Sequence, residues 1–435
     1  MRRSYFFLIV IVGGILAVLT TLFFVFDNPY RRLNPEPTPV VTAPTLDDQL
    51  PPSAGEATDT ELITVLELPT IGLTTGVDGL RLVFYDKDSS KIEVTEFDGT
   101  GLQELSDTLL GVEAMELSPA KDKAWMRLTD PETKDLITLV YDFRAKEAVR
   151  LENGIKAIDW SPDGSELLYY VDRSGSAPAL KRVKANGVEP RTVRQGFTVQ
   201  NPVLAWYAED QLAYWLSPSS TRPSSIITMN LSGNNAVELA ATAPAAQALF
   251  SPDGTYALLA QNNPTTGKPQ LALSTTADRT TSALPLTTWL DKCTWMNDSA
   301  RILCFVPRDL PGNFVYPESD TGANAYRDQL WVIDAATAKP QLIYDVPGSI
   351  TDATKPFAST NGSRLNFISR ASGTVVSLEL ADKLVAPTTP NASTNLITPA
   401  GATTAPGTSS SSGGSGSGTG SLPTGSSTSG SGTTY

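Results

Sequence analysis

The side chains best suited to acid–base and nucleophilic chemistry are unusually restricted in this chain. Histidine, which most often exchanges protons near neutral pH, does not occur among the 435 residues. Ser-His-Asp and Cys-His nucleophiles and histidine-ligated zinc sites are therefore excluded. Carboxylate pairs, tyrosine and lysine remain, so the composition disfavours catalysis without excluding it. We expect no catalytic residues, no cofactor and no metal centre.

The two cysteines, Cys293 and Cys304, flank the turn sequence Asn297-Asp298. A hairpin that turns at residues 298–299 sets the two cysteines opposite each other on adjacent strands. This spacing predicts a cross-strand disulfide, provided that the segment lies in an oxidising compartment. The alternative is a pair of buried, reduced thiols that serve as small apolar side chains.

Residues 307–327, PRDLPGNFVYPESDTGANAYR, form a long segment of mixed chemistry. Long loops on a rigid scaffold often carry binding residues, because aromatic side chains supply contact area and acidic ones attract a cation or a basic partner. The alternative is an ordinary variable loop. The candidate partner-binding residues are Asp309, Phe314, Tyr316, Glu318, Asp320, Tyr326 and Arg327.

The charge of the chain bears on its partners. With 33 basic and 46 acidic residues, the formal net charge is −13. Binding to nucleic acid without sequence preference needs clustered lysine and arginine to displace counterions. We therefore expect no nucleic-acid partner.

An uncharged apolar run occupies residues 5–26, YFFLIVIVGGILAVLTTLFFVF. At 1.5 Å per residue, such a helix spans roughly 33 Å, about the hydrocarbon thickness of a bilayer. A cleaved signal peptide is the alternative, but its apolar region is usually shorter and ends in small residues. We therefore predict a transmembrane signal anchor, with residues 1–4 in the cytoplasm and the rest of the chain outside.

Two segments have compositions that do not favour a packed core. Residues 27–60 contain seven prolines, which favour an extended linker that spaces the following domain from the membrane. Residues 386–435 consist mostly of threonine, proline, serine and glycine, so we expect a disordered tail.

Between these segments, residues 61–385 contain an internal repeat. Its clearest copies are residues 158–164, IDWSPDG, and residues 248–254, ALFSPDG. Each copy joins one short apolar run to another through a Pro-Asp-Gly turn, which is the pattern of a β-hairpin. We expect the aspartates of these copies, Asp163 and Asp253, to hold turns.

Weaker copies extend the repeat along the domain. Successive anchor positions lie 42, 43, 46, 44, 45 and 63 residues apart, and the last interval contains the 307–327 segment. Intervals of this length suit a propeller blade of four short strands. The sequence therefore predicts an all-β fold, a β-propeller of about seven four-stranded blades, with six or eight as alternatives. The anchors are Thr75, Leu117, Trp160, Trp206, Phe250, Trp295 and Ala358.

The last repeat lacks its outermost strand, because the tail composition begins soon after Lys383. Residues 61–68, ELITVLEL, precede the first repeat and have the composition of a strand. We predict that this segment completes the last blade and closes the ring, which removes exposed strand edges.

The segments Trp160–Gly164 and Phe250–Gly254 resemble the blade signature of TolB-like, WD-repeat-like propellers, which is also found in the propeller domain of prolyl oligopeptidase relatives. The resemblance covers roughly residues 61–385 and implies the fold more strongly than a function, because propellers serve as enzymes, scaffolds and lectins. It also implies that the anchor aromatics pack between neighbouring blades. The hydrolase domain of the peptidase relatives has no counterpart in the sequence.

The hypothesis that joins these features is a single-pass membrane protein. Its extracytoplasmic propeller binds a protein or another envelope component as a scaffold, without catalysis. A second hypothesis is an extracytoplasmic hydrolase or lyase that uses carboxylates in the central funnel of the ring. A third is a stalk that holds the tail away from the membrane.

Overall fold

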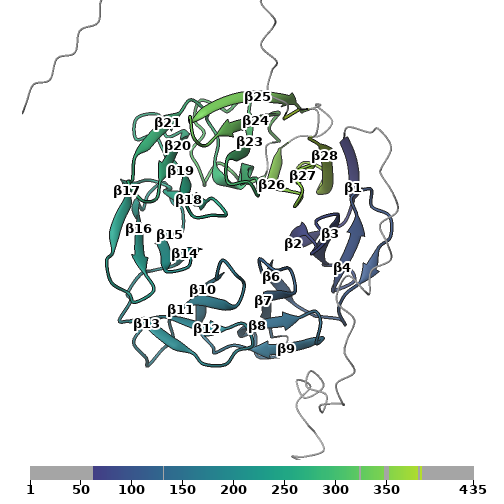
Figure 1. The fold of residues 1–435 in the computed structure, drawn as a ribbon, viewed down its shortest axis with the longest axis vertical. Coiled ribbons are helices and arrows are strands. Elements are labelled where there is room, and N and C mark those ends of the chain that lie inside the picture. Colours follow the sequence, from purple (N-terminus) through teal and green to yellow (C-terminus); the bar gives the residue numbers. More distant parts are fainter. Residues whose placement is uncertain (1–61, 131, 323–324, 347–351, 381–382, 385–435) are drawn as a thin grey trace, which may run out of the picture. The chain divides into compact units, whose positions relative to one another are not determined.

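The computed structural model describes residues 62–130, 132–322, 325–346, 352–380 and 383–384, which form seven sheets around a ring (Figure 1). The predicted membrane segment 5–26, the linker 27–60 and the tail 386–435 lie outside the described residues. Within the described ranges, no helix is long and apolar enough to cross a membrane.

Each blade is an antiparallel sheet of four strands. The strands of each blade are named below in order from the centre of the ring outward. The strands of the first four blades are β2 (Thr70–Thr75), β3 (Arg81–Asp86), β4 (Lys91–Glu96) and β5 (Gln103–Glu104); β6 (Val112–Leu117), β7 (Lys123–Thr129), β8 (Leu136–Asp142) and β9 (Glu147–Arg150); β10 (Ile155–Trp160), β11 (Glu166–Val171), β12 (Ala179–Lys184) and β13 (Arg191–Gln195); β14 (Pro202–Ala208), β15 (Gln211–Leu216), β16 (Ser224–Asn230) and β17 (Val237–Ala243). The strands of the last three are β18 (Gln247–Phe250), β19 (Tyr256–Asn262), β20 (Pro269–Thr275) and β21 (Thr281–Leu284); β22 (Cys293–Trp295), β23 (Arg301–Pro307), β24 (Asp328–Asp334) and β25 (Lys339–Asp345); β26 (Ala353–Ala358), β27 (Arg364–Ser369), β28 (Thr374–Glu379) and β1 (Leu62–Leu66).

The prediction of seven four-stranded blades is confirmed. Every predicted anchor lies in the innermost strand of a blade, and six of the seven are its last residue. The alternatives of six or eight blades are therefore excluded.

The Pro-Asp-Gly turns explain where the innermost strands end. Asp163 Oδ1 accepts hydrogen bonds from the Ser161 hydroxyl at 2.6 Å and the Ser165 amide at 3.0 Å. Asp253 Oδ1 makes the same bonds in its own turn. Gly254 has φ +72°, and a Cβ there would lie 2.6 Å from the Tyr207 carbonyl oxygen of the preceding blade. Glycine is therefore required both by the turn and by the close approach of the blades.

Two anchor tryptophans connect neighbouring blades. Trp160 Nε1 donates to the Glu116 carbonyl at 3.2 Å, and Trp295 Nε1 donates to the Leu249 carbonyl at 2.9 Å. Each acceptor belongs to the residue just before the anchor of the preceding blade. Both rings are buried with apolar side chains of two blades. The anchor aromatics thus pack between blades, as the resemblance implies.

The ring closes through its first and last strands. β1 pairs antiparallel with β28, with Leu62 opposite Leu378 and Thr64 opposite Val376. The last blade thereby combines one strand from the start of the domain with three from its end, as predicted. Val65 and Leu66 are buried against the first blade.

Candidate functional site

The topology gathers the loops of interest on one face of the ring. Strand direction alternates within a blade, so the start of the innermost strand lies on the same face as the loop between the second and third strands. The loop from β23 to β24, residues 308–327 (the insertion), therefore shares this face with η2 (Leu290–Lys292), a turn of 3₁₀ helix just before β22. We call it the insertion face.

The insertion is fastened to the ring by its aromatic side chains. Trp289, just before η2, is fully buried, and its ring centroid lies 5.1 Å from Phe314, 5.6 Å from Tyr316 and 6.1 Å from Tyr326. Phe314, Tyr316 and Tyr326 are 1%, 5% and 5% exposed. This burial corrects the expectation that the three aromatics supply contact area to a partner: they form a small core beneath the loop.

Two polar contacts fix the insertion to two other blades of the ring. Glu318 Oε1 accepts a hydrogen bond from the Ser220 amide at 3.0 Å, in the loop between β15 and β16. Asp320 forms an ion pair with Arg370, which follows β27. Arg370 Nη2 also donates to Thr354 at 3.4 Å. The insertion thus contacts both the fourth and the seventh blades.

The charged candidate residues that remain accessible are separated from this aromatic core. Asp309, Glu318 and Arg327 are exposed, whereas Asp320 is held in its ion pair. The structure therefore divides the seven sequence-predicted residues into a buried aromatic group, two acidic residues that fix the insertion (Glu318 and Asp320), and the exposed Asp309 and Arg327.

A carboxylate and a phenol meet where the insertion contacts η2. The Tyr316 hydroxyl donates to Asp291 Oδ2 at 3.4 Å and accepts a hydrogen bond from Gln247 Nε2 at 3.3 Å. Asp291 is exposed, but neighbouring protein atoms restrict the hydration of its carboxylate and raise its pKa, and the charge of Asp320 raises it further. Burial, and then the charge of Asp291, raise the pKa of Tyr316, so its phenol stays protonated at neutral pH. This arrangement can hold a proton or a polar ligand group.

Beside Asp291, a fully buried lysine ties three segments together. Lys292 Nζ lies 2.9 Å from Asp328 Oδ2, 2.9 Å from Asp352 Oδ1 and 2.8 Å from the Ala353 carbonyl oxygen. Burial raises the pKa of Asp328, and the adjacent Lys292 charge opposes that rise. Because these groups have no access to solvent, we assign them to holding η2 against β24 and β26.

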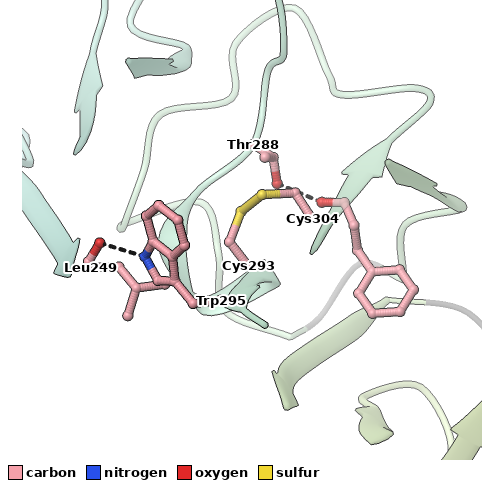
Figure 2. The surroundings of a disulfide bond; sticks show 6 residues. Leu249, Thr288, Cys293, Trp295 and Cys304 are labelled. Carbon is pink, nitrogen blue, oxygen red and sulfur yellow. Dashed lines mark hydrogen bonds between the residues drawn. A yellow bond between two sulfur atoms is a disulfide. The ribbon is translucent and has the colours of Figure 1, made fainter. Parts of the chain in front are cut away.

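Cys293 follows Lys292 directly and continues this anchoring. It lies opposite Cys304 in the β22–β23 register, and the two sulfurs are bonded (Figure 2). The Thr288 hydroxyl donates to the Phe305 carbonyl at 2.7 Å on the same hairpin. The disulfide therefore secures the strand that follows η2. Closing a loop of this size contributes roughly 3 kcal/mol of stability in the chain-entropy account.

A second group of carboxylates lies on innermost strands away from the insertion. Glu116 on β6 and Asp159 on β10 each precede an anchor residue. Glu116 Oε2 accepts a hydrogen bond from Trp125 Nε1 at 3.2 Å, and Asp159 Oδ2 accepts one from the Trp206 amide at 2.6 Å. We call these two residues the channel pair.

Both carboxyls of the channel pair have raised pKa values. Glu116 retains contact with solvent, but the surrounding strands restrict the hydration of its carboxylate and raise its pKa. Restricted hydration, and then the charge of Glu116, raise the pKa of Asp159 well above its usual value. The pair therefore holds protons more tightly than ordinary surface carboxylates do.

Several of these residues were missed by sequence reasoning. Gln247, Asp291, Lys292, Asp352 and Arg370 come from loops or strand ends of three blades, and none stands in a recognisable local pattern. In the described part of the chain, no three acidic or cysteine side chains are grouped so that they could hold a metal ion.

Comparison with known proteins extends the description of the fold. No family model and no curated protein matches the chain. Two structures of oligogalacturonate lyase are similar. One, in complex with manganese, is 12% identical over 73% of this chain and 90% of that chain, with a TM-score of 0.53. The other, from Vibrio parahaemolyticus, is 11% identical over 74% and 91%, with a TM-score of 0.52.

TolB from Acinetobacter baumannii is 14% identical over 71% of this chain and 78% of that chain, with a TM-score of 0.38. That score is too low to carry an argument about TolB. The identities to the lyases are low enough that their likeness concerns the fold alone. The similarity to TolB-like propellers therefore stays a resemblance of the blade segments.

Proposed function

We propose that this chain is a membrane-anchored, TolB-like propeller whose insertion face binds a protein or another component of the cell envelope, without catalysis. One observation carries the proposal: the insertion is fixed by a buried aromatic core and by contacts of Glu318 and Asp320 to two other blades, while the charged side chains of Asp309 and Arg327 remain exposed. A loop that is already ordered loses little conformational entropy when it binds.

The proposed topology places residues 1–4 in the cytoplasm, 5–26 across the membrane and the propeller outside. The uncharged run of residues 5–26 supports the anchor, and the Cys293–Cys304 disulfide is typical of an oxidising compartment. Protease added to intact cells that express the chain should digest the propeller. Protection until the cells are lysed would contradict this topology.

The binding proposal is tested by affinity capture with the full chain in detergent. A variant with Asp309→Ala and Arg327→Ala is compared with one carrying Arg144→Ala and Glu209→Ala. Both sets remove one basic and one acidic exposed side chain, but the second set lies in turns on the opposite face.

The proposal would be supported if the natural chain and the opposite-face variant both capture a cross-linked envelope component and the insertion variant does not. Cross-links should map to the insertion. Equal capture by all three proteins, or by none, would contradict a binding role for the insertion face.

A second candidate function is carboxylate chemistry at the channel pair, as a hydrolase or lyase. The raised pKa values of Glu116 and Asp159 favour it, because a carboxyl that binds its proton more tightly is better suited to act as a general acid. The lyase structures lead us to test oligogalacturonate, with chain cleavage as the readout. Activity that Glu116→Gln abolishes would support this function, and absence of cleavage would count against it.

A further inference from the structure

A hollow of about 480 Å³ lies on the face opposite the insertion. Its lining comes from the ends of innermost strands and the turns that follow them in the first, second, sixth and seventh blades. Cavities of this volume accommodate small organic ligands. The hollow is thus separate from the insertion face, and a ligand bound in it is independent of the proposed envelope binding.

Lys121 is the charged residue of this lining. Its ammonium donates to the Thr74 hydroxyl of the neighbouring blade at 3.3 Å, and among the described residues it forms no ion pair. Burial lowers the pKa of Lys121, and the charge of Glu116, which lies outside the lining and bonds to Trp125, opposes that fall. An ammonium at the wall of a hollow that is hydrogen-bonded to a hydroxyl and forms no direct ion pair keeps donors for an anion.

The rest of the lining combines hydroxyl and aromatic groups. Thr294, Thr360 and Asn297 provide hydrogen-bonding side chains, and the half-buried Phe357 provides aromatic surface. The Asn297 amide is positioned by a hydrogen bond to the Thr360 carbonyl at 2.9 Å. Aromatic surface next to several hydroxyl groups matches a sugar ring, which has an apolar face and a polar rim.

We propose that this hollow binds a small carboxylated sugar, whose carboxylate pairs with Lys121. The threonine and asparagine side chains bond to the sugar hydroxyls, and the half-buried Phe357 packs against the ring. A single ammonium matches one carboxylate charge. The lining offers neither a second cation nor a cluster of basic residues for a phosphate group.

The proposal is tested by calorimetric titration of the full chain in detergent at pH 7 with three probes. Glucuronate carries both the carboxylate and the sugar ring, glucose only the ring and acetate only the carboxylate. We expect glucuronate to bind at least about ten-fold more tightly than either of the others, because a charge-assisted hydrogen bond contributes more than one ten-fold step.

Variants then place the site. Lys121→Met should weaken glucuronate binding at least about ten-fold, and Lys121→Arg should restore part of it. Lys146→Met is the matched control, because Lys146 is an exposed turn residue with φ 54° and Lys121 has φ 59°. Ala120→Phe, from an exposed position in the lining, should block the hollow without disturbing the core.

The Ala120→Phe result decides the question if Lys121→Met does not fold. Absence of glucuronate binding, equal binding of glucose, or binding that neither Lys121→Met nor Ala120→Phe weakens would overturn the proposal. Tight binding of acetate alone would show a simple anion site and would overturn the sugar assignment.

Discussion

Lys292 shows how a single buried charge can determine local structure. Its ammonium compensates the carboxylates of Asp328 and Asp352, and none of the three side chains is more than 1% exposed. We expect Lys292→Met to lower the free energy of unfolding by about 3–5 kcal/mol, because buried Asp328 loses its counter-charge and Asp352 keeps only Arg370, 3.7 Å away. Urea unfolding of the full chain measures this free energy. The control is Lys87→Met, at an exposed position, whose free energy of unfolding should lie within about 0.5 kcal/mol of that of the natural chain.

A double-mutant cycle separates this charge effect from lost packing. If the charges interact, Asp328→Asn costs much less stability in the Lys292→Met background than in the natural chain. Costs that simply add would show that Lys292 acts through its aliphatic chain alone.

Asp159 makes stability depend on pH. Its raised pKa means that the folded state binds a proton more tightly than the unfolded state. The stability that this proton contributes is fully present below the pKa of Asp159 in the unfolded chain, which is about 4. It is lost as the pH rises through the pKa of Asp159 in the folded chain. Asp159→Asn keeps an acceptor for the Trp206 amide but removes the titration.

We therefore expect the melting temperature of Asp159→Asn, relative to the natural chain, to increase by roughly 2 °C or more between pH 4 and pH 8. Thermal unfolding at several pH values measures this difference. Asp278→Asn, in an exposed turn, should show no such trend. A constant difference between the Asp159 variant and the natural chain would contradict the raised pKa.

At the scale of the blade, the indole hydrogen bonds between blades give a second prediction. Trp160→Phe and Trp295→Phe each remove a bond to the preceding blade, and we expect each to cost about 1–2 kcal/mol. Trp206 is a natural control, because its indole donates at 3.4 Å to Glu209 in its own turn.

Trp206→Phe should therefore cost less in the same chemical denaturation experiment. Equal losses for the three variants would show that ring size, rather than the bond between blades, determines the contribution of these tryptophans.

Sequence reasoning succeeded where structure is determined locally. Turn chemistry at Asp163-Gly164 and Asp253-Gly254 identified the ends of innermost strands, because an aspartate side chain and a glycine in the left-handed region fix such turns. The spacing of Cys293 and Cys304 around their turn likewise predicted the register that the structure shows.

The insertion shows why the rest could not be predicted in this way. Phe314, Tyr316 and Tyr326 are buried because Trp289, a residue of the preceding loop, lies against them. Likewise, Asp320 is paired with Arg370, 50 residues further along the chain. Such contacts depend on how the blades bring distant loops together, and no local pattern carries that information.

At the scale of the whole molecule, the ring depends on one pairing that joins residues far apart in the sequence. β1 pairs with β28 to complete the last blade, so a defect in β1 uncouples the first blade from the last. In every other blade all four strands follow one another along the chain, so a similar defect in an outermost strand leaves that blade joined to the next through the backbone. The two cases can be compared directly, because Thr64 in β1 and Thr192 in β13 are both exposed threonines in outermost strands.

We expect Thr64→Pro to destabilise the chain more than Thr192→Pro, by at least about 1–2 kcal/mol, and to broaden the unfolding transition. Proline disturbs strand pairing in both variants, but only the first opens the ring and exposes two sheet edges. Chemical denaturation of the full chain gives the stabilities, and hydrogen exchange of β28 and β2 reports whether the first and last blades open together. If the two variants lose equal stability and β28 stays protected in Thr64→Pro, the ring is held by packing between blades, and the shared blade is not its closing element.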